Sequence, residues 1–293
     1  MKPIRAGEEG LILVNVLLFV AIASGLVLLM VNREELALDG ALRMREASRA
    51  AAIVRGGELS ALTALRRDAE DAPEVDHRAE PWAAVAQRNI PIEGGGSFDL
   101  AVADAEGRFN INNVRSGESS AVILFESIAR DAGMTPEQIV QAIGYVRAAG
   151  PVTDLRPIRL AGLNPATADR LGRMVTALPV QTQINLNAAG RELMTLLLRD
   201  PVAVERLLAV RERKGFLDRD DLSRENLMMP PGLRLASDHF WVRTRASVGS
   251  TSQQGAALIE RRKRDDGTRE TVVVERWRGA AMPPDVPEFP AAR

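Results

Sequence analysis

The sequence predicts an α+β fold: a long N-terminal helix, followed by an antiparallel sheet that an inserted all-α domain interrupts. Three observations predict it. An uncharged apolar run occupies residues 11–31, strand-like alternation occurs near residue 100 and again after residue 240, and short capped helices lie between. With 293 residues, 46% of them hydrophobic, the chain suffices for one large domain or two smaller ones, and disorder throughout is excluded.

The composition excludes several classes of function. Lys and Arg number 38 against 39 Asp and Glu, so overall charge gives no sign of a basic nucleic-acid binder. The chain has no cysteine, which removes disulfides, thiol catalysis and cysteine-ligated metals. Its two histidines, His77 and His239, are far apart, so a multi-histidine metal site is excluded. We therefore expect no enzyme, no catalytic residue and no metal ligand.

The apolar run predicts a transmembrane helix over residues 11–32. Its uncharged stretch of 21 residues spans roughly 30 Å at 1.5 Å per residue, the thickness of one bilayer core. A cleavable secretory signal is the alternative, because Ala21-Ile22-Ala23 fits the signal-peptidase pattern. Cleavage there would leave the apolar residues 26–31 as a new N-terminus, which favours the transmembrane interpretation.

A short polar leader ending in Glu8-Glu9-Gly10 directly precedes Leu11. This arrangement resembles the prepilin-peptidase site of type IV pilins and type II secretion pseudopilins. The resemblance implies a leader of residues 1–10, processing between Gly10 and Leu11, and methylation of the new N-terminus.

The fifth residue of the mature chain is Asn15, where that family usually has glutamate. In the family picture this glutamate pairs with the N-terminal amine of a neighbouring subunit, since a charge in the bilayer is costly unless it is paired. A subunit at the tip has no subunit ahead of it, so Asn15 marks an assembly position exempt from that pairing. The alternative is a tolerated polar residue in a membrane helix.

The helical pattern continues from Asn32 to about Glu70, with a break or kink predicted at Gly56-Gly57. Residues 71–97 are predicted as loop, with Trp82 anchoring it to the body. Residues 98–102 and 108–112 then alternate apolar and polar around a turn at 104–107, which predicts a β-hairpin.

Residues 119–226 predict five or six short helices with their own core. Thr135 begins a capping box followed by proline, and Asn164-Pro165 and Asp200-Pro201 repeat the pattern of a cap followed by proline. Asn187 is expected to cap a helix that ends near Leu198, and Gly215 suits a helix end.

Strands return over residues 240–248, 254–262 and 270–278, the last two joined by a turn at 265–268. In the first of them, five alternate residues are expected to share one face: Phe240, Val242, Thr244, Ala246 and Val248. Residues 281–293 contain four prolines and are predicted to be a disordered tail. Because the helical block interrupts the strands, we interpret it as an insertion.

Taken in this order, the parts resemble the K family of type II secretion minor pseudopilins, general secretion pathway protein K. Three further segments carry the resemblance: Gly107 to Asn113, Ile184 to Ala189, and Ser237 to Phe240. The sequence departs from the family at Ala188, where threonine is usual, and in a weakly acidic stretch over residues 145–157. The resemblance implies the following organisation: leader 1–10, transmembrane helix 11–32, pilin-like spine and first strands 33–115, inserted helical domain 116–232, pilin-like strands 233–280, tail 281–293.

The resemblance also implies a function. A K-type protein is a non-catalytic subunit at the tip of the pseudopilus, where it helps to initiate assembly and supports protein secretion across the outer membrane. Implied partners are the I-, J- and H-type minor pseudopilins, the major pseudopilin and prepilin peptidase. The implied location is the bacterial inner membrane, crossed once, with the bulk in the periplasm. We expect no cofactor; relatives can bind calcium through acidic loops, but no such site can be assigned here.

Two alternatives remain. Residues 184–222 resemble the helix-hairpin-helix of competence-type DNA-binding proteins, through Arg211, Lys214, Gly215, Phe216 and Asp221. Such hairpins bind phosphate through backbone N–H groups, whereas the turn 198–201 contains a proline and an aspartate, so we favour a packing module and expect no nucleic acid. The other alternative is a type IV pilus minor pilin with an unrelated insertion.

The remaining charged segments are predicted to be surface features. His77 lies among Glu74, Asp76 and Glu80, which suits a solvated loop better than a weak cation site. His239 is expected on a strand surface, and residues 261–264 on a charged hairpin face.

Overall fold

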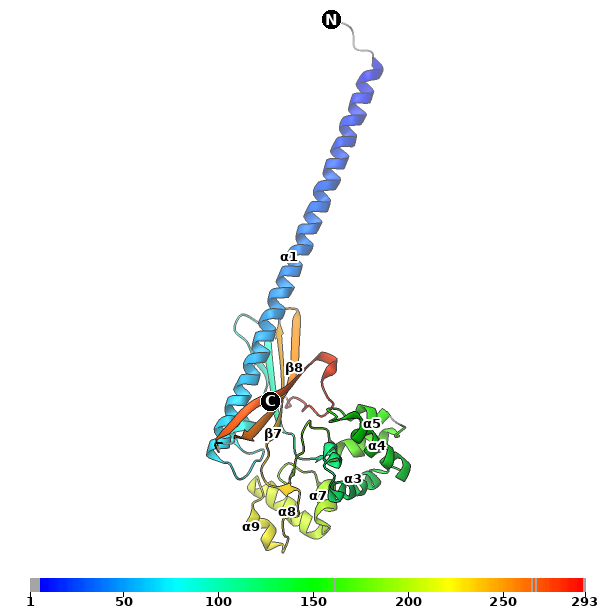
Figure 1. Cartoon of the computed structure of the whole chain (residues 1–293). Coiled ribbons are helices and arrows are strands. Elements are labelled where there is room, and N and C mark those ends of the chain that lie inside the picture. The colour runs from blue at the N-terminus through cyan, green and yellow to red at the C-terminus, as the bar shows by residue number, and fades with distance from the viewer. Residues whose placement is uncertain (1–5, 161, 265, 267, 292–293) are drawn as a thin grey trace.

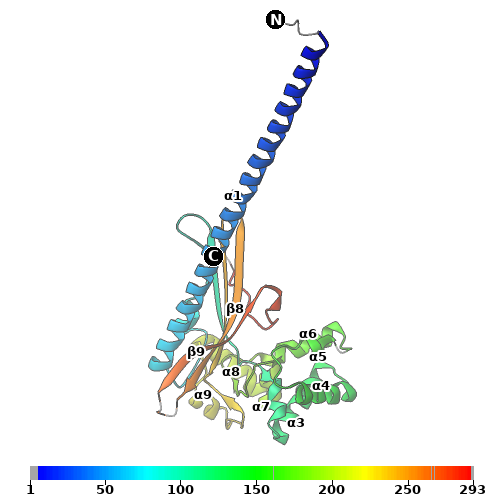
Figure 2. The same cartoon turned by 45° about the horizontal axis from the view of Figure 1, so that its top comes forward.

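A computed structural model describes residues 6–160, 162–264, 266 and 268–291 of the chain. Helix α1 (Ala6–Asp71) is a long rod whose N-terminal half stands free and whose C-terminal half lies along a five-stranded sheet (Figure 1). The other helices gather at the end of the molecule farthest from the N-terminus, as the turned view also shows (Figure 2). The predicted α+β class is confirmed.

Helix α1 is continuous through Gly56 and Gly57, so the predicted break is wrong. A Cβ atom on Gly57 would lie 2.5 Å from the ring of Phe98 and 3.0 Å from the methyl group of Thr244. The glycine therefore lets the helix approach the sheet closely. A glycine inside a helix costs up to about 1 kcal/mol, and burial of Leu65 and its small neighbours on the same face offsets this cost.

The sheet has the order β1-β2-β7-β8-β9, and all its neighbouring strands are antiparallel. The strands are β1 (Gln87–Pro91), β2 (Ser97–Asp104), β7 (His239–Val248), β8 (Thr251–Lys263) and β9 (Arg269–Arg278). The three strands predicted after residue 240 are confirmed. The five alternate residues of β7 are all buried and share one face, as predicted: Phe240 and Val242 pack with Leu65 of α1, and Ala246 and Val248 pack with Ala50. The predicted turn at 265–268 lies partly outside the described residues.

Residues 71–97 contain two elements that the sequence did not indicate, α2 (Pro81–Ala84) and β1. Trp82 is buried, and its ring meets Phe240 edge-on with 5.1 Å between ring centroids. Its predicted role as an anchor for this segment is confirmed.

The predicted hairpin around residues 104–107 is wrong. Strand β2 pairs with β1 and β7, while the chain beyond Glu106 enters the helical domain. There β3 (Phe109–Asn110) pairs in parallel with β4 (Val175–Thr176), and the 3-10 helix η1 (Ile111–Arg115) follows. The alternation of residues 109–112 has another cause: Phe109 and Ile111 enter the helical core, and the two asparagines place buried amides against backbone carbonyls.

The helical domain interrupts the sheet between two strands that pair with each other, since Asp104 at the end of β2 lies opposite Phe240 at the start of β7. Its described residues form seven helices, not five or six, and a short parallel pair, β5 (Ile184–Asn185) with β6 (Leu233–Arg234). The helices are α3 (Ser119–Ala132), α4 (Pro136–Ala149), α5 (Arg156–Leu160), α6 (Pro165–Met174), α7 (Arg191–Leu198), α8 (Pro201–Lys214) and α9 (Arg219–Arg224). They enclose a core of their own, centred on residues such as Phe125 and Leu171.

The helix caps mostly follow the sequence. Thr135 forms its capping box with Gln138, Asn164 and Asp200 cap α6 and α8, and Gly215 ends α8 in a left-handed conformation. The prediction for Asn187 is wrong, because Gly190 occupies the N-cap of α7. The Asn187 side chain instead donates to the Leu217 and Leu235 carbonyls and accepts from Leu217 N–H.

Residues 282–291 follow the 3-10 helix η2 (Gly279–Ala281) and pack against the molecule, in place of the disorder predicted from their prolines, and residues 292–293 of the predicted tail lie outside the described residues. Val286 is 9% exposed and lies in a cluster with Trp241 and Leu258, on the sheet face opposite α1. Prolines fit here because these residues add no strand to the sheet and need no ladder of N–H donors.

Candidate functional site

The predicted processing and assembly residues lie near the free end of α1. Gly10 and Leu11 lie within the helix, and Asn15 is an exposed residue one turn beyond Leu11. Residues 13–45 are all exposed, although many are large and apolar. Within the described residues, one helix, α1, is long enough and apolar enough to cross a membrane. Processing at Gly10 and the role of Asn15 stay predictions.

The three family-like segments, distant in sequence, meet where the chain leaves and re-enters the sheet. A Cβ atom on Gly107 would lie 2.6 Å from the backbone oxygen of Ala188, so the first two segments touch through their backbones. Asn185, fully buried in the second segment, donates to Ser237 Oγ of the third at 2.9 Å and to Asp104 Oδ2 at 2.8 Å. The segments therefore build a joint between sheet and helical domain.

Asp104 is the acceptor at the centre of this joint. Its Oδ2 accepts from Ser237 Oγ at 2.6 Å and its Oδ1 from Glu106 N at 2.7 Å. Burial raises the pKa of Asp104 to about 7, because the low-dielectric surroundings disfavour the charged form and the hydrogen bonds offset only part of that effect.

A second group of polar side chains lies beside Asp104. It includes His239, for which the predicted position on a strand surface is wrong. His239 is 4% exposed, not on the surface, and its Nδ1 lies 2.6 Å from Oε1 of the fully buried Glu106. Arg234 pairs with the other oxygen of Glu106 and with Asp238 Oδ2 at 2.6 Å. These side chains border a cleft of about 550 Å³. Because buried charges need partners, the network ties the start of β7 to the exit of β2.

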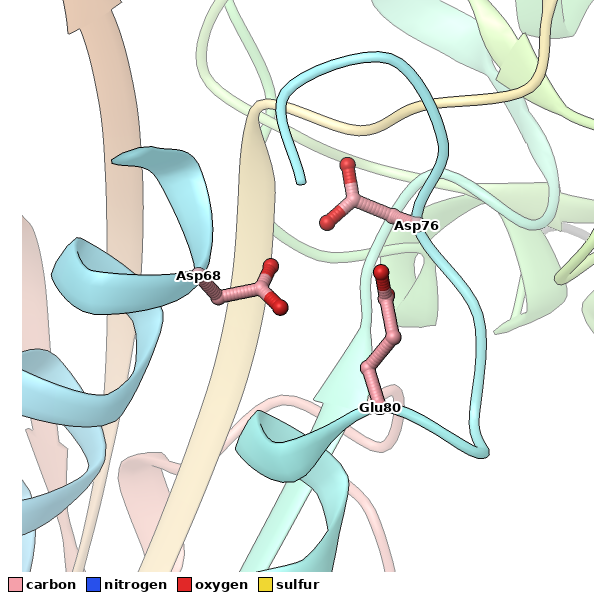
Figure 3. Close-up of side chains that lie close together, drawn as sticks. All are labelled: Asp68, Asp76 and Glu80. Carbon is pink, nitrogen blue, oxygen red and sulfur yellow. The ribbon is translucent and has the colours of Figure 1, made fainter. Parts of the chain in front are cut away.

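A third group lies at the end of α1. Asp68 in α1, Asp76 in the following loop and Glu80 before α2 point toward one another, and their carboxylate oxygens lie within 4.8 Å (Figure 3). Arg261 of β8 binds two of them, with Nη1 2.5 Å from Asp76 Oδ1 and Nη2 2.6 Å from Asp68 Oδ2.

The predicted charged hairpin face at residues 261–264 is wrong for Arg261. It is 5% exposed, and its guanidinium lies 4.4 Å from the centre of the Phe240 ring, whereas Arg262, Lys263 and Arg264 are exposed. The cause is the alternation of β8, which puts Arg261 on the same buried face as Ile259.

This acidic cluster does not fit calcium. Calcium takes six to eight oxygen ligands at about 2.3–2.6 Å. Here Arg261 already binds Asp68 and Asp76, and Glu80 Oε2 accepts from Trp82 Nε1 at 2.8 Å and from His77 N at 2.7 Å. The guanidinium thus supplies the positive charge beside Asp68 and Asp76, and two N–H donors hold Glu80. No other cluster of three such side chains occurs in the described part of the chain.

The loop around His77 is structured, which corrects the prediction of a solvated loop. The His77 ring stacks on Phe216, at the end of α8, with 4.6 Å between centroids and 8° between planes. Burial lowers the pKa of His77 by disfavouring the imidazolium. The loop therefore contacts the helical domain from the side of α8 and α9.

The helix hairpin α7–α8 uses its polar groups internally. Asp200 Oδ1 accepts from Ala203 N–H at 3.0 Å, so a carboxylate occupies the N-terminus of α8 where a DNA-binding hairpin would hold phosphate. Arg211 Nη1 donates to the backbone oxygens of Leu186 (2.8 Å) and Ala189 (2.7 Å), and Lys214 pairs with Asp221 at 2.9 Å. These contacts favour the packing role over DNA binding.

Sequence reasoning missed Arg261, Asp104 and Glu106. A signal existed for Arg261, since strict alternation from Ile259 places it on the buried face. None existed for the two acids, because their partners lie about 80 to 130 residues away in the sequence.

The buried carboxyl of Glu80 makes stability depend on pH. Burial raises its pKa from 4.5 to about 7, against the two hydrogen bonds that lower it. The folded protein therefore holds this proton more tightly than the unfolded chain, so the stabilisation is complete below the unfolded pKa and is lost as pH rises through about 7. Between about pH 5 and 8, the free energy of unfolding of Glu80→Gln should fall by about 1–2 kcal/mol less than that of the wild type. Glu74→Gln, an exposed control, should behave as wild type; equal pH profiles for the wild type and Glu80→Gln would contradict the assignment.

Known proteins that are similar to this chain were found by sequence and by fold. No family model matches the chain. Type II secretion system protein K of Pseudomonas aeruginosa is 26% identical, over 88% of this chain and 90% of that protein. Its Klebsiella pneumoniae counterpart is 24% identical, over 89% and 94%. The fold matches a chain in the crystal structure of the GspK–GspI–GspJ complex from the enterotoxigenic Escherichia coli type 2 secretion system, with a TM-score of 0.61, 17% identity, and coverage of 80% of this chain and 98% of that chain. The resemblance indicated by the motifs is thus confirmed: over nearly nine-tenths of its length, this chain is similar to type II secretion system protein K.

Proposed function

We propose that this chain is a non-catalytic minor pseudopilin at the tip of a type II secretion pseudopilus. It crosses the inner membrane once, with its bulk in the periplasm, and helps to initiate assembly in support of secretion across the outer membrane. The similarity to K proteins over almost the full chain supports the family part of this proposal. The shape of the molecule supports the position at the tip.

The observation that carries the proposal is the division of α1 into two halves. From residue 13 to residue 45 the helix is uncovered, and beyond the predicted membrane span it still exposes Leu36, Leu42 and Met44 to 57–74%. From Ala50 onward one face of the helix is buried against its own sheet. A rod left uncovered for more than thirty residues is suited to packing beside similar rods through close helix–helix contacts.

The helical domain explains why such a rod would end a filament. It lies at the end of the molecule opposite the free part of α1 (Figures 1 and 2), where a further subunit in a stack would have to sit. Asn15 agrees with this position, because an uncharged residue needs no amine from a neighbouring subunit. With the helical domain at one end and the free part of α1 at the other, further subunits can pack on this subunit from one side only.

The partners follow from the resemblance. A K protein of known structure was crystallised with its I and J counterparts, and we propose the same types of partner here, together with the H-type and major pseudopilins. Prepilin peptidase would remove residues 1–10 and methylate Leu11. The joint and the acidic cluster are assigned structural roles, since Glu106, Asp68 and Asp76 are paired with arginines and Asp104 and Glu80 accept hydrogen bonds within the protein.

The position of the chain in the filament can be measured with a single label. The chain has no cysteine, so Val140→Cys, 69% exposed on α4, introduces one reactive thiol on the helical domain. Filaments assembled with this variant and labelled with maleimide-gold should carry gold at one end only. Met228→Cys, 88% exposed in the same domain, should give the same pattern. Gold distributed along the filaments would refute the tip position, and filaments labelled by neither variant would refute incorporation.

A further inference from the structure

The C-terminal segment, residues 283–291, contacts the helical domain through the buried carboxylate of Asp285 and through Val286. Asp285 Oδ1 accepts from Arg108 Nη1 at 2.8 Å, and its Oδ2 accepts from Thr176 Oγ1 at 3.0 Å. Arg108 lies at the entrance to the helical domain and also donates to the Gly172 carbonyl of α6 at 3.1 Å. The Asp285 side chain is 4% exposed, so this ion pair is shielded from solvent and its loss is costly.

The same segment contacts the sheet. Val286 packs with Trp241 and Leu258 on the face opposite α1, and Leu178 of the helical domain joins this cluster. A few residues further on, the ring of Phe289 lies 4.6 Å from the guanidinium of Arg243 and 4.8 Å from that of Arg245. Residues 285–289 therefore bridge the two halves of the molecule.

The other attachments of the helical domain lie elsewhere, and they include the joint around Asn185 beside the paired chain connections. Its two chain connections run side by side, because the end of β2 pairs with the start of β7, and two adjacent crossings allow rotation about the line between them. The loop that carries His77 contacts the domain at Phe216, on the side of α8. Among the described elements, no helix of the domain packs extensively on the sheet or on α1. The half that contains α6 and β4 thus meets the sheet through Leu178 and through the tail, which adds the ion pair between Asp285 and Arg108.

We propose that residues 283–291 are a latch, with Asp285 as its bolt, that fixes the α3–α6 half of the helical domain against the outer face of the sheet. When the latch is released, this half moves about the paired crossings and the Trp241–Trp277 pair becomes accessible. The latch thereby sets the orientation of the helical domain, at the end of the molecule opposite the free part of α1.

Spin labels test the latch in the full chain in detergent micelles. Because there is no native cysteine, Leu59→Cys on α1 and Val140→Cys on α4 give one defined pair of exposed labels. We expect a single narrow distance distribution in the otherwise wild-type chain. Asp285→Ala and Arg108→Met should each broaden it, with a matching rise in acrylamide quenching of tryptophan fluorescence. A chain ending at Met282 should show the largest change.

Glu288→Ala is the matched control. It removes a carboxylate from the same segment, but Glu288 is exposed and makes no ion pair within the described residues, so the distribution should stay narrow. A narrow, unshifted distribution in both Asp285→Ala and Arg108→Met would overturn the latch, whether or not the shortened chain folds. Equal broadening by Glu288→Ala would overturn it as well, since Asp285 would then have no special role.

Discussion

Replacing Arg261 with methionine is expected to lower the free energy of unfolding by about 3–5 kcal/mol, the cost of breaking a buried ion pair from one side. Arg261 is the shared partner of Asp68 and Asp76, which are 5% and 2% exposed. Methionine fills much of the same volume over Phe240 but leaves two carboxylates close together without a counter-charge. Burial already raises the pKa of Asp68 in spite of Arg261, so removal of the guanidinium should raise it further.

Urea unfolding of the full chain in micelles, followed by tryptophan fluorescence, measures this loss. Arg262→Met is the matched control, because the neighbouring arginine is exposed, pairs only with Glu270 at 3.1 Å among the described residues, and should cost less than about 1 kcal/mol. Adding Asp68→Asn and Asp76→Asn to Arg261→Met should restore part of the stability by removing the unpaired charges. The same small loss for Arg261→Met as for Arg262→Met would show that the cluster is not held by its arginine.

The sequence was enough to predict those features that depend only on residues close together in the chain. The capping pattern at Thr135 and the proline starts at Asn164 and Asp200 depend on residues within one turn of helix, and each is confirmed. The burial of alternate residues in β7 follows equally from the geometry of a strand. The interruption of the sheet could be inferred because the order of strands and helices is visible without any contact.

The errors have one physical origin, which is partners distant in the sequence. Gly57 was expected to break α1, yet it is the contact with Phe98, about forty residues later, that explains a glycine there. The alternation at Phe109–Asn112 has a strand period, but the acceptors of its asparagines lie in the helical domain. The tail was judged by its prolines alone, although Asp285 binds Arg108 from 177 residues away.

Replacing Gly10 with valine is expected to leave the chain as an uncut precursor and to abolish its part in secretion. By resemblance, the peptidase cuts after this glycine, and a branched side chain would fill the space that the enzyme needs close to the backbone. An unprocessed chain would keep charged residues such as Glu8 and Glu9 at the start of the apolar rod, where burial beside neighbouring rods is costly. Gly7→Val, the same change three residues upstream, should be processed normally.

The proposed function depends on this conversion, because only a chain that begins at Leu11 presents an apolar rod from its first residue. Intact-mass measurement of the protein extracted from membranes tests it most directly. The account predicts a wild-type and a Gly7→Val protein that lack residues 1–10 and carry one N-terminal methyl group, and a Gly10→Val protein that retains its leader. A wild-type chain that keeps residues 1–10, or one cut at Ala23, would contradict it.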